Sequence, residues 1–373
     1  MPDLVQLGED LRKIDRLIMD LVKRRMDVAH LVAQEKQRTG GVMYRPDIED
    51  QRIARIGEHA QAIGLNPHMA RALLYFLIAE SCKEQTILLE SQAGAAKAPE
   101  AERLKDNLLR LTEMVAPGYD ARDGQSKFAS HAFAAYELDL IRHEVAALPT
   151  HGLGLDLGCA TGRIALELGA SFAQAAGYDL SPHMVEAARA NARALGATNV
   201  AFAQLDLDAQ DLPHADSSAS FVVMNLGTAS DVSNLPRVLA EIARVLAPGG
   251  RFLLTFYNAD ALLYKMGFLP WVASLEAVVN PYTNCLDVKI GGAPMPVHAQ
   301  LYCEAQARAL MPAGLCVDNV TSFPQIAAIM PDEVLGDDKV RASIDRLDRE
   351  LAKGADGSHA GAYLVVRGVR VAE

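Results

Sequence analysis

The chain has 373 residues, of which 50% are hydrophobic and 22% are charged, enough for two or three globular domains. Its formal net charge of -11 argues against general binding to nucleic acid or to anionic membranes. The five cysteines form no CxxC pair, and we find neither a signal peptide nor an apolar run long enough to cross a bilayer. These features predict a cytoplasmic protein without a disulfide framework or a metal site.

The first part of the chain predicts three helices. Apolar residues recur at helical spacing over residues 4–38, and Thr39 and two glycines end the pattern. A second helix is predicted over residues 47–62 and a third from Pro67 to about residue 92. Periodicity alone indicates a helical scaffold or a dimerisation arm.

Two cations on the first helix suggest more than a scaffold. Arg25 and Lys36 share a helical face with the apolar residues Ala29 and Val32. Cations that project from an apolar face are costly unless an anion meets them. We therefore expect an anionic ligand at this face.

Three stretches carry a family resemblance. Residues 17–36, LIMDLVKRRMDVAHLVAQEK, are similar to the first helix of the all-helical (type II) chorismate mutases. Residues 42–53, VMYRPDIEDQRI, resemble the start of that family's second helix. Residues 77–85, LIAESCKEQ, place Gln85 four residues after Ser81, as the third helix does. The resemblance covers residues 4–90.

The resemblance implies a role for each matching residue. Arg25 would bind a substrate carboxylate, and Glu49 would hold the ring hydroxyl. Lys36 and Gln85 would donate to the ether oxygen, which gains charge as its bond to carbon breaks. Because the rearrangement of chorismate to prephenate is pericyclic, positioning and electrostatic stabilisation would supply the catalysis.

Two positions depart from the family. Gly8 and Ile48 stand where the family has arginines, although Arg12 lies one turn from Gly8 on the same face. The loss of two cations would cost several kcal/mol, at roughly 1.5–3 kcal/mol for each charged hydrogen bond. Three interpretations stay open: an active mutase, a domain that keeps only binding or assembly, and a pocket for a related shikimate-pathway compound. Since these mutases form intertwined helical dimers, the resemblance also implies a homodimer through this domain.

The composition divides the chain into two domains. Residues 91–100 are small and polar and include a proline, which is typical of a linker. We therefore predict a helical domain over residues 1–92, a linker over 93–104 and a second domain over 105–373.

A strand, a glycine-rich turn and a helix open the main part of the second domain. Residues 152–168 read GLGLDLGCATGRIALEL, and this order places free backbone N–H groups at a helix N-terminus. The turn resembles motif I, (D/E)xGxGxG, of the class I S-adenosylmethionine-dependent methyltransferases. The resemblance implies that the loop wraps the methionine and ribose of that cofactor, through Asp156, Gly158, Ala160 (in place of the middle glycine) and Gly162.

Further motifs follow in the family's order. Asp179 ends the second strand, where a carboxylate can accept from both ribose hydroxyls, although a dinucleotide-binding dehydrogenase places an acid there too. In DLSPHM, Met184 would pack on the adenine. In DAQDLP, Asp208 would accept from the adenine amino group and the Ala209 backbone would meet the ring, with Asp206 as a rival for the role of Asp208.

The order of elements predicts a doubly wound, Rossmann-like parallel α/β sheet that binds its ligand at the carboxyl ends of the strands. Asn225 would end the fourth strand beside the sulfonium. Tyr257 and Asn258, at the end of the fifth strand, are candidate catalytic residues for the methyl acceptor, with His131, His143 and His298 as other possible bases. By the same resemblance, residues 258–330 would form a substrate lid, with an extra sheet or helix layer as the alternative. Tyr119, Lys127 and Phe128 would belong to a segment that folds over the cofactor, with an ordinary solvated loop as the alternative.

Together these features predict methyl transfer from S-adenosylmethionine to a small molecule, with a chorismate- or prephenate-derived acid as the acceptor. An alternative is the synthesis of carboxy-S-adenosylmethionine from prephenate, which needs an arginine in the cofactor pocket. In another alternative the helical domain serves only for dimerisation.

Overall fold

The structure is a computed structural model that describes residues 3–39, 46–67, 69–71, 73–74, 77–78, 81, 97–120, 128–265, 279–280, 284–290, 293–331, 334–353 and 359–371. The chain divides into two units near Lys97. Helix α4 (Lys97–Val115) begins inside the segment predicted as a linker.

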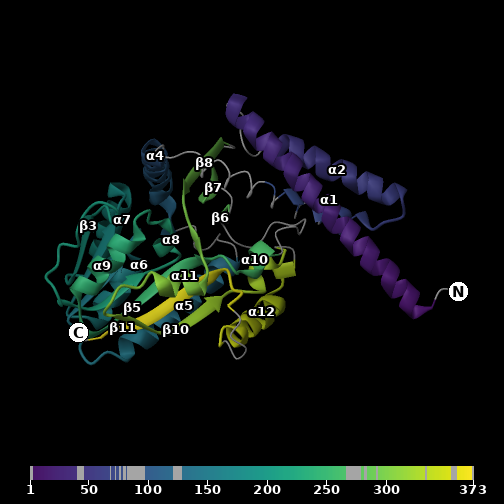
Figure 1. Ribbon diagram of the computed structural model, residues 1–373. Helices are drawn as coiled ribbons and strands as arrows, with labels where there is room; N and C mark the ends of the chain where they lie inside the picture. Colours follow the sequence, from purple (N-terminus) through teal and green to yellow (C-terminus); the bar gives the residue numbers. More distant parts are fainter. Residues whose placement is uncertain are drawn as a thin grey trace. The chain divides into compact units, whose positions relative to one another are not determined.

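The first unit is helical, as predicted. Helix α1 spans Leu4–Thr39 and helix α2 spans Pro46–Ala62 (Figure 1). The described residues between 67 and 81 are also helical. Small and β-branched side chains supply the buried positions of this unit: Ala29, Ile53, Ala60, Ala70 and Ile78.

The second unit is built on a sheet in the order β10-β11-β5-β4-β1-β2-β3, with β9 beside β5. Strands β1 to β5 are parallel to one another, and the order reverses between β1 and β4. Ligands bind at such a reversal, outside the carboxyl ends of the strands. The strands are β1 (Leu153–Leu157), β2 (Gln174–Asp179), β3 (Val200–Gln204), β4 (Ala219–Met224), β5 (Leu246–Asn258), β9 (Leu301–Tyr302), β10 (Leu315–Phe323) and β11 (Tyr363–Arg370).

One strand corrects the prediction of a parallel sheet. Strand β11 pairs antiparallel with β5 from Tyr363 opposite Tyr257 to Val369 opposite Arg251, and it is also antiparallel to β10. Strand β11 therefore lies between β5 and β10 and makes the sheet mixed. Its direction depends on pairing between distant segments, which residue patterns within one strand do not record.

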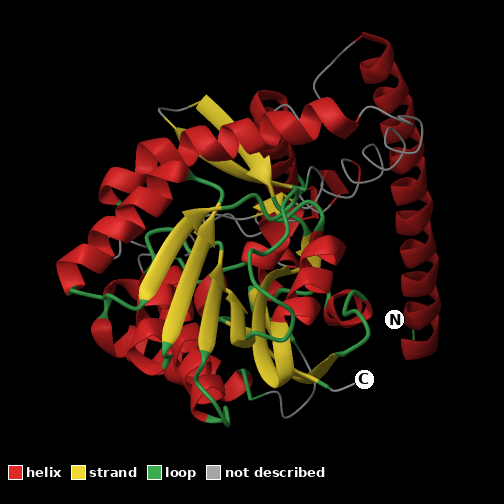
Figure 2. Ribbon diagram, turned by 90° about the vertical axis from the view of Figure 1, so that its left-hand side faces the viewer, coloured by secondary structure: helices red, strands yellow, loops and turns green. Residues whose placement is uncertain are grey.

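Helices cover both faces of the sheet (Figure 2). One apolar cluster joins α9 to the sheet through residues such as Leu239 and Phe252. Another joins α5, α6 and α12 to the opposite side through residues such as Phe133 and Leu253. The helices are α5 (Phe128–Ala146), α6 (Arg163–Ser171), α7 (Pro182–Leu195), α8 (Thr228–Asp231), α9 (Leu235–Val245) and α12 (Asp338–Leu351). Among the described helices, none is both long and apolar enough to cross a membrane.

The described elements between β5 and β9 lie outside the main sheet and span fewer residues than the predicted lid. It contains α10 (Leu262–Lys265) and a small antiparallel sheet of β6 (Val279–Asn280), β7 (Cys285–Ile290) and β8 (Ala293–His298). Then β9, α11 (Glu304–Ala309) and β10 return to the main sheet. Residues 301–323 therefore belong largely to the sheet layer, which agrees with the predicted alternative for this part of the range and not with a lid.

Candidate functional site

The motif I turn contains three residues with a left-handed backbone. Gly158, Ala160 and Gly162 have φ values of 81°, 45° and 88°, all in the left-handed region. The N–H groups of Gly158 and Cys159 donate to the carbonyl of Tyr178 at 2.7 and 2.9 Å. The loop therefore lies against the end of β2, and Ala160 adopts a conformation that usually favours glycine.

Asp156 lies in β1, directly before the motif I turn, and bonds to the elements on either side of it. The residue is fully buried, and its carboxylate accepts from the Ala165 N–H and from the Asn225 side chain, both at 2.9 Å. Burial raises the pKa of Asp156 to about 7. Asp156 and Asn225 therefore join the ends of β1 and β4 to the start of α6, a positioning role next to the predicted cofactor contacts.

Asp179 faces the motif I loop from the end of β2. Its two carboxylate oxygens accept from the N–H groups of Ala160 and Ser181, both at 2.8 Å. Burial raises its pKa. Because each carboxylate oxygen can accept a second hydrogen bond, the group keeps capacity for a ribose diol. Met184 is buried in the first turn of α7, where the Ser181 hydroxyl accepts from its N–H at 3.3 Å.

The segment after β3 contains both acids proposed for the adenine. Asp208 is half-buried, and its carboxylate accepts from the Asn234 N–H at 2.7 Å. Asp206 pairs with Lys105 of α4 and accepts from the Asp208 N–H. The Ala209 N–H donates to the Asp206 carbonyl at 3.1 Å, so this donor is already used within the loop. Asp208 therefore has fewer internal partners than Asp206.

A buried glutamate that sequence reasoning missed holds the turn after β4. Glu137 of α5 is fully buried and accepts from the Leu226 N–H at 3.0 and 3.2 Å and from the Thr255 hydroxyl. Burial raises its pKa to about 7. Leu226 and Gly227 have φ values of 51° and 91°, so Glu137 stabilises a left-handed turn beside the motif I loop.

The two candidate catalytic residues of β5 have different environments. A Cβ on Gly227 would lie 2.7 Å from the Tyr257 ring, so this ring covers the turn after β4. Asn258 is fully buried, and its amide donates to the carbonyls of His359 and Gly361 at 2.7 Å each. These contacts use the Asn258 amide within the protein, which favours a structural role for it, and Tyr257 remains the stronger of the two catalytic candidates.

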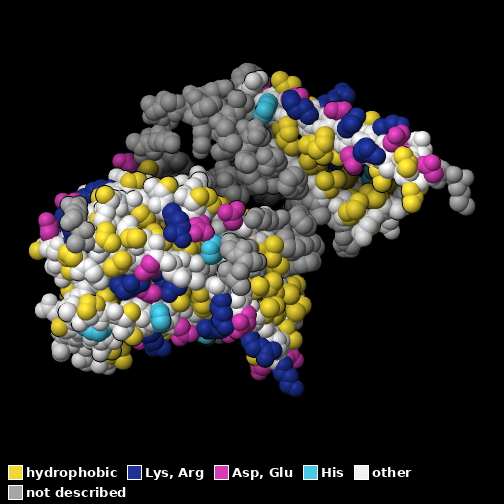
Figure 3. Space-filling model, turned by 60° about the horizontal axis from the view of Figure 1, so that its bottom comes forward, with side chains coloured by type: hydrophobic (Ala, Val, Ile, Leu, Met, Phe, Trp, Pro, Cys, Tyr) yellow, Lys and Arg dark blue, Asp and Glu magenta, His cyan; other side chains and the backbone are white. Residues whose placement is uncertain are grey.

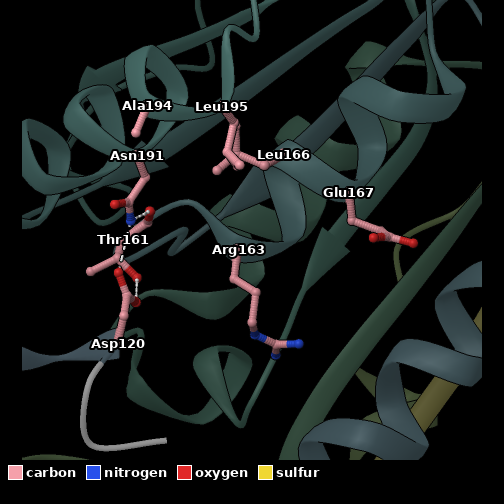
Figure 4. Close-up of a pocket in the computed structure, with 8 residues that line it drawn as sticks. All are labelled: Asp120, Thr161, Arg163, Leu166, Glu167, Asn191, Ala194 and Leu195. Carbon is pink, nitrogen blue, oxygen red and sulfur yellow. Dashed lines mark hydrogen bonds between the residues drawn. The ribbon is translucent and has the colours of Figure 1, made fainter.

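The segment before α5 lies against the motif I loop. Asp120 accepts from the Thr161 hydroxyl at 2.6 Å and from the Asn191 side chain at 2.8 Å (Figure 4). Tyr119 is close enough to raise the pKa of Tyr257, whose largest perturbation is burial. Lys127 lies outside the described residues, and Phe128 begins α5.

A hollow of about 500 Å³ adjoins this contact. It is lined by Asp120, Thr161, Arg163, Leu166, Glu167, Asn191, Ala194 and Leu195. In Figure 4 the Arg163 side chain extends away from the Asp120, Thr161 and Asn191 contacts. None of the predicted cofactor-binding residues is among its lining residues.

Three buried polar atoms of the second unit fit a site that takes a polar ligand. Arg163 Nη2, Asp231 Oδ1 and His298 Nε2 are buried without a hydrogen-bond partner in the described part of the chain. Arg163 follows motif I, Asp231 ends α8, and His298 lies near Asp208. Buried polar groups are usually hydrogen-bonded, so Asp231 and His298 have capacity for a polar ligand, whereas the Arg163 guanidinium is close enough to Asp156 and Glu137 to lower their pKa values. Thr321, Gln325 and Arg367 also carry buried atoms without a partner in the described residues, so the left-handed loop and Asp179 are the features that fit the predicted nucleoside cofactor.

The other predicted histidines lie elsewhere. His131 and His143 are exposed on α5. Burial lowers the pKa of the His298 imidazole, and Asp208 raises it in part. In the described residues no three His, Cys, Asp or Glu side chains gather as metal ligands would.

The helical unit brings some of its predicted residues together. Arg25 donates to the Leu77 carbonyl and to the Ser81 hydroxyl, which ties α1 to the third helical segment. Lys36 is half-buried. The Glu49 side chain and Gln85 lie outside what the structure describes. Arg12 folds back over Gly8, with its Nε donating to the Gly8 carbonyl at 3.1 Å.

Each of the two units matches the model of a known protein family. Residues 155–250 match a family model described as "Methyltransferase domain", and residues 7–86 match "Chorismate mutase type II". The "Demethylmenaquinone methyltransferase" of Symbiobacterium thermophilum is 29% identical over 55% of this chain and 85% of its own length. The "S-adenosyl-L-methionine-dependent Diels-Alderase iccD" of Talaromyces variabilis is 33% identical over 29% of this chain and 37% of its own length. A solved Haloferax volcanii complex of the Trm112 methyltransferase activator with a putative methyltransferase is 20% identical, with a TM-score of 0.43, over 69% of this chain and 96% of that one.

The second unit is therefore an S-adenosylmethionine-dependent methyltransferase domain, and S-adenosylmethionine is its cofactor. The first unit is a type II chorismate mutase domain. The chain is an enzyme that carries these two domains in one polypeptide.

Proposed function

We propose that the chain methylates a small acid derived from chorismate or prephenate. The observation that carries this proposal is the presence of a chorismate mutase domain and a methyltransferase domain in one chain. A mutase domain binds chorismate or its product, so such acids would be available to a methyltransferase domain in the same chain. The support for this proposal is that the two domains share one polypeptide.

The residues of the second unit would bind and orient the cofactor. Asp179 would accept from the ribose hydroxyls, Asp208 from the adenine amino group, and the loop at Gly158–Gly162 would lie against the methionine. S-adenosylmethionine, when bound, supplies an activated methyl group. The protein then needs chiefly to align the acceptor with it and exclude water.

The proposal is tested with the full chain, S-adenosylmethionine and one acid at a time. Chorismate, prephenate, phenylpyruvate and 4-hydroxyphenylpyruvate form the panel, and mass spectrometry detects the methylated acid. A reduced naphthoquinone is added because one relative is named a demethylmenaquinone methyltransferase. We expect methylation of at least one acid. Methylation of the quinol alone would overturn the proposed acceptor class.

We also propose that the first unit binds chorismate and converts it to prephenate. Arg25 and Lys36 would meet the substrate, and Arg12 would supply a cation where the family has an arginine at the position of Gly8. The Arg12 guanidinium supports this because its Nη2 lies 3.7 Å from where a Gly8 Cβ would be. The loss of chorismate absorbance in the ultraviolet tests the activity. We expect Arg25→Ala to abolish the decay and Arg12→Ala to slow it at least tenfold, with Arg16→Ala as a control on the same helix.

Helix α1 carries an apolar face that supports a proposal about the partner of the first unit. Large apolar side chains on α1 remain exposed in the described chain (Figure 3). They recur every three or four residues along the helix: Leu4, Leu7, Leu11, Ile14, Ile18 and Leu21. Full burial of a Leu or Ile side chain contributes about 1.5–3 kcal/mol, so such a face favours association. We propose a homodimer formed through α1.

Sedimentation equilibrium tests the dimer. The wild-type chain should sediment as a dimer, and the double variant Leu11→Lys with Ile18→Lys should sediment as a monomer. Leu195→Lys, at an exposed leucine of α7, is the control and should remain dimeric. A monomeric wild type would contradict the proposal. A dimer with no chorismate decay would favour an assembly role for the first unit.

A second candidate function rests on Arg163. Carboxy-S-adenosylmethionine synthesis from prephenate requires a cation for the additional carboxylate, and Arg163, directly after motif I, has a buried nitrogen without a hydrogen-bond partner among the described residues. The mass of the nucleoside that co-purifies with the protein separates the two functions. Ordinary S-adenosylmethionine or its demethylated form supports methyl transfer, and the carboxylated nucleoside supports the alternative.

A further inference from the structure

Asp231 lies at the edge of the sheet where the strands β4 and β5 end. It ends α8, directly after the turn that follows β4, and Tyr257 lies near the end of the neighbouring parallel strand β5. Ser230, the neighbour of Asp231 in the chain, links α8 to β5, because its hydroxyl accepts from the Tyr257 N–H at 2.9 Å. The Ser230 carbonyl also accepts from the Gln300 N–H at 2.8 Å, which holds α8 from the other side.

The Asp231 side chain is half-buried and differs from the fully buried carboxylates of this edge. Asp156 and Glu137 have both of their oxygens in hydrogen bonds with protein groups. Asp231 interacts with the Tyr257 hydroxyl, but its Oδ1 is buried with no partner in the described residues. A buried acceptor without a partner is costly unless a ligand uses it.

Contacts place this pair beside the motif I loop. A Cβ on Gly158 would overlap the Thr228 side chain, with Oγ1 only 2.9 Å away, so Thr228 at the start of α8 touches that loop. Tyr257 covers Gly227, the residue before Thr228. The loop, the turn after β4 and the pair Asp231–Tyr257 therefore form one continuous surface.

We propose that Asp231, assisted by the Tyr257 hydroxyl, is the base that accepts the proton of a weakly acidic hydroxyl, enolic or phenolic, on the methyl acceptor. This inference rests on the proposed methyl transfer. A lone pair of the acceptor oxygen forms the new bond to the methyl carbon. The bond from that carbon to sulfur breaks, with both electrons going to sulfur. The hydroxyl proton passes to the Asp231 carboxylate and is released to solvent after the product leaves.

The pKa shifts of Asp231 and Tyr257 fit an acceptor with an enolic or phenolic hydroxyl. Burial raises the pKa of Asp231 to about 8, while the Tyr257 hydrogen bond lowers it in part. Burial raises the pKa of Tyr257 well above its ordinary value, and Asp231, Tyr363, Tyr264 and Tyr119 add to this, so Tyr257 stays a neutral donor. A base of this strength matches an enol or a phenol, whereas an aliphatic alcohol is too weak an acid.

The test compares the full-length wild type with Asp231→Asn, Tyr257→Phe and the surface control Asp106→Asn, using the acid of the panel that the wild type methylates. A positioned base contributes about 10²–10⁴-fold, so we expect kcat of Asp231→Asn to fall at least 100-fold. KM and the affinity for S-adenosylhomocysteine should stay within twofold. Tyr257→Phe should lower kcat about tenfold, and Asp106→Asn should match the wild type.

A second readout follows the protonation of the Asp231 carboxyl directly by NMR. In protein labelled with 13C at aspartate carboxyls, the Asp231 signal is identified by its absence from Asp231→Asn, and its midpoint should lie near pH 8. Tyr257→Phe should raise that midpoint, and wild-type kcat should rise through the same pH. Titration near pH 4, or full activity of Asp231→Asn, would overturn the assignment. If the wild type methylates no acid of the panel, the proposed function fails and the inference fails with it.

Discussion

Replacing Gly158 by alanine perturbs the motif I loop at its point of contact with α8. Gly158 has a φ of 81°, and an added Cβ would overlap the Thr228 side chain. Thr228 cannot turn away freely, because its hydroxyl donates to the Asn225 carbonyl at 2.6 Å. The substitution therefore acts on the loop, on α8 and on the end of β4 together.

Three effects set the magnitude. A non-glycine residue in the left-handed region costs about 1–2 kcal/mol. Overpacking against Thr228 costs about 1–3 kcal/mol. Displacement of Thr228 loses a hydrogen bond of about 1 kcal/mol. We expect Gly158→Ala to lower the free energy of unfolding of the second unit by about 3–6 kcal/mol and to weaken S-adenosylhomocysteine binding.

Urea denaturation and calorimetry measure these two quantities. Gly196→Ala is the matched control, since Gly196 has a φ of 67° and nothing within 4 Å of an added Cβ, so only the backbone cost of about 1–2 kcal/mol remains. The double variant Gly158→Ala with Thr228→Ala should recover the overpacking part. Equal destabilisation by Gly158→Ala and Gly196→Ala would refute the reasoning.

Two further predictions concern buried carboxylates. Asp348 accepts from the N–H groups of Gln325, Ile326 and Ala327 at 2.9, 2.7 and 2.9 Å, so Asp348→Ala should cost about 3 kcal/mol in urea denaturation, and a loss under 0.5 kcal/mol would contradict this. Burial raises the pKa of Glu137 from 4.5 to about 7, so the folded state holds a proton that the unfolded chain releases, and the stability from this group is lost as the pH rises from about 4.5 to 7. Glu137→Gln should therefore lose about 3 kcal/mol less stability than the wild type between pH 4.5 and 7.5, and parallel curves would contradict the assignment.

The parts of the site that local patterns encode could be predicted from the sequence. Motif I and the acid at the end of β2 lie within one strand–turn–helix unit and the strand after it. The structure has the predicted strand β1 and helix α6 around the motif I turn, and Asp179 ends β2 as predicted. The spacing of nearby residues is enough to predict these positions, because the elements involved are consecutive in the sequence.

Residues that act across long sequence separations could not be predicted in this way. Glu137 reaches Leu226 and Thr255, 89 and 118 residues further along the chain, and no local pattern marks it. Asn258 has a strand-end position that suggested catalysis, but segments about 100 residues away use its amide. Asp231 was missed for the same reason, since its interaction with Tyr257 depends on the pairing of β4 with β5.

The binding of S-adenosylhomocysteine by the full-length chain, measured by calorimetry beside NAD, tests most directly whether the motif I loop and Asp179 hold an adenosyl sulfur cofactor. The wild type should bind S-adenosylhomocysteine and give no heat with NAD. Asp179→Asn should bind about 100-fold more weakly, since it weakens charge-assisted hydrogen bonds worth about 1.5–3 kcal/mol each, and Asp106→Asn should bind like the wild type. Unchanged affinity in Asp179→Asn, or binding of NAD without S-adenosylhomocysteine, would contradict the account.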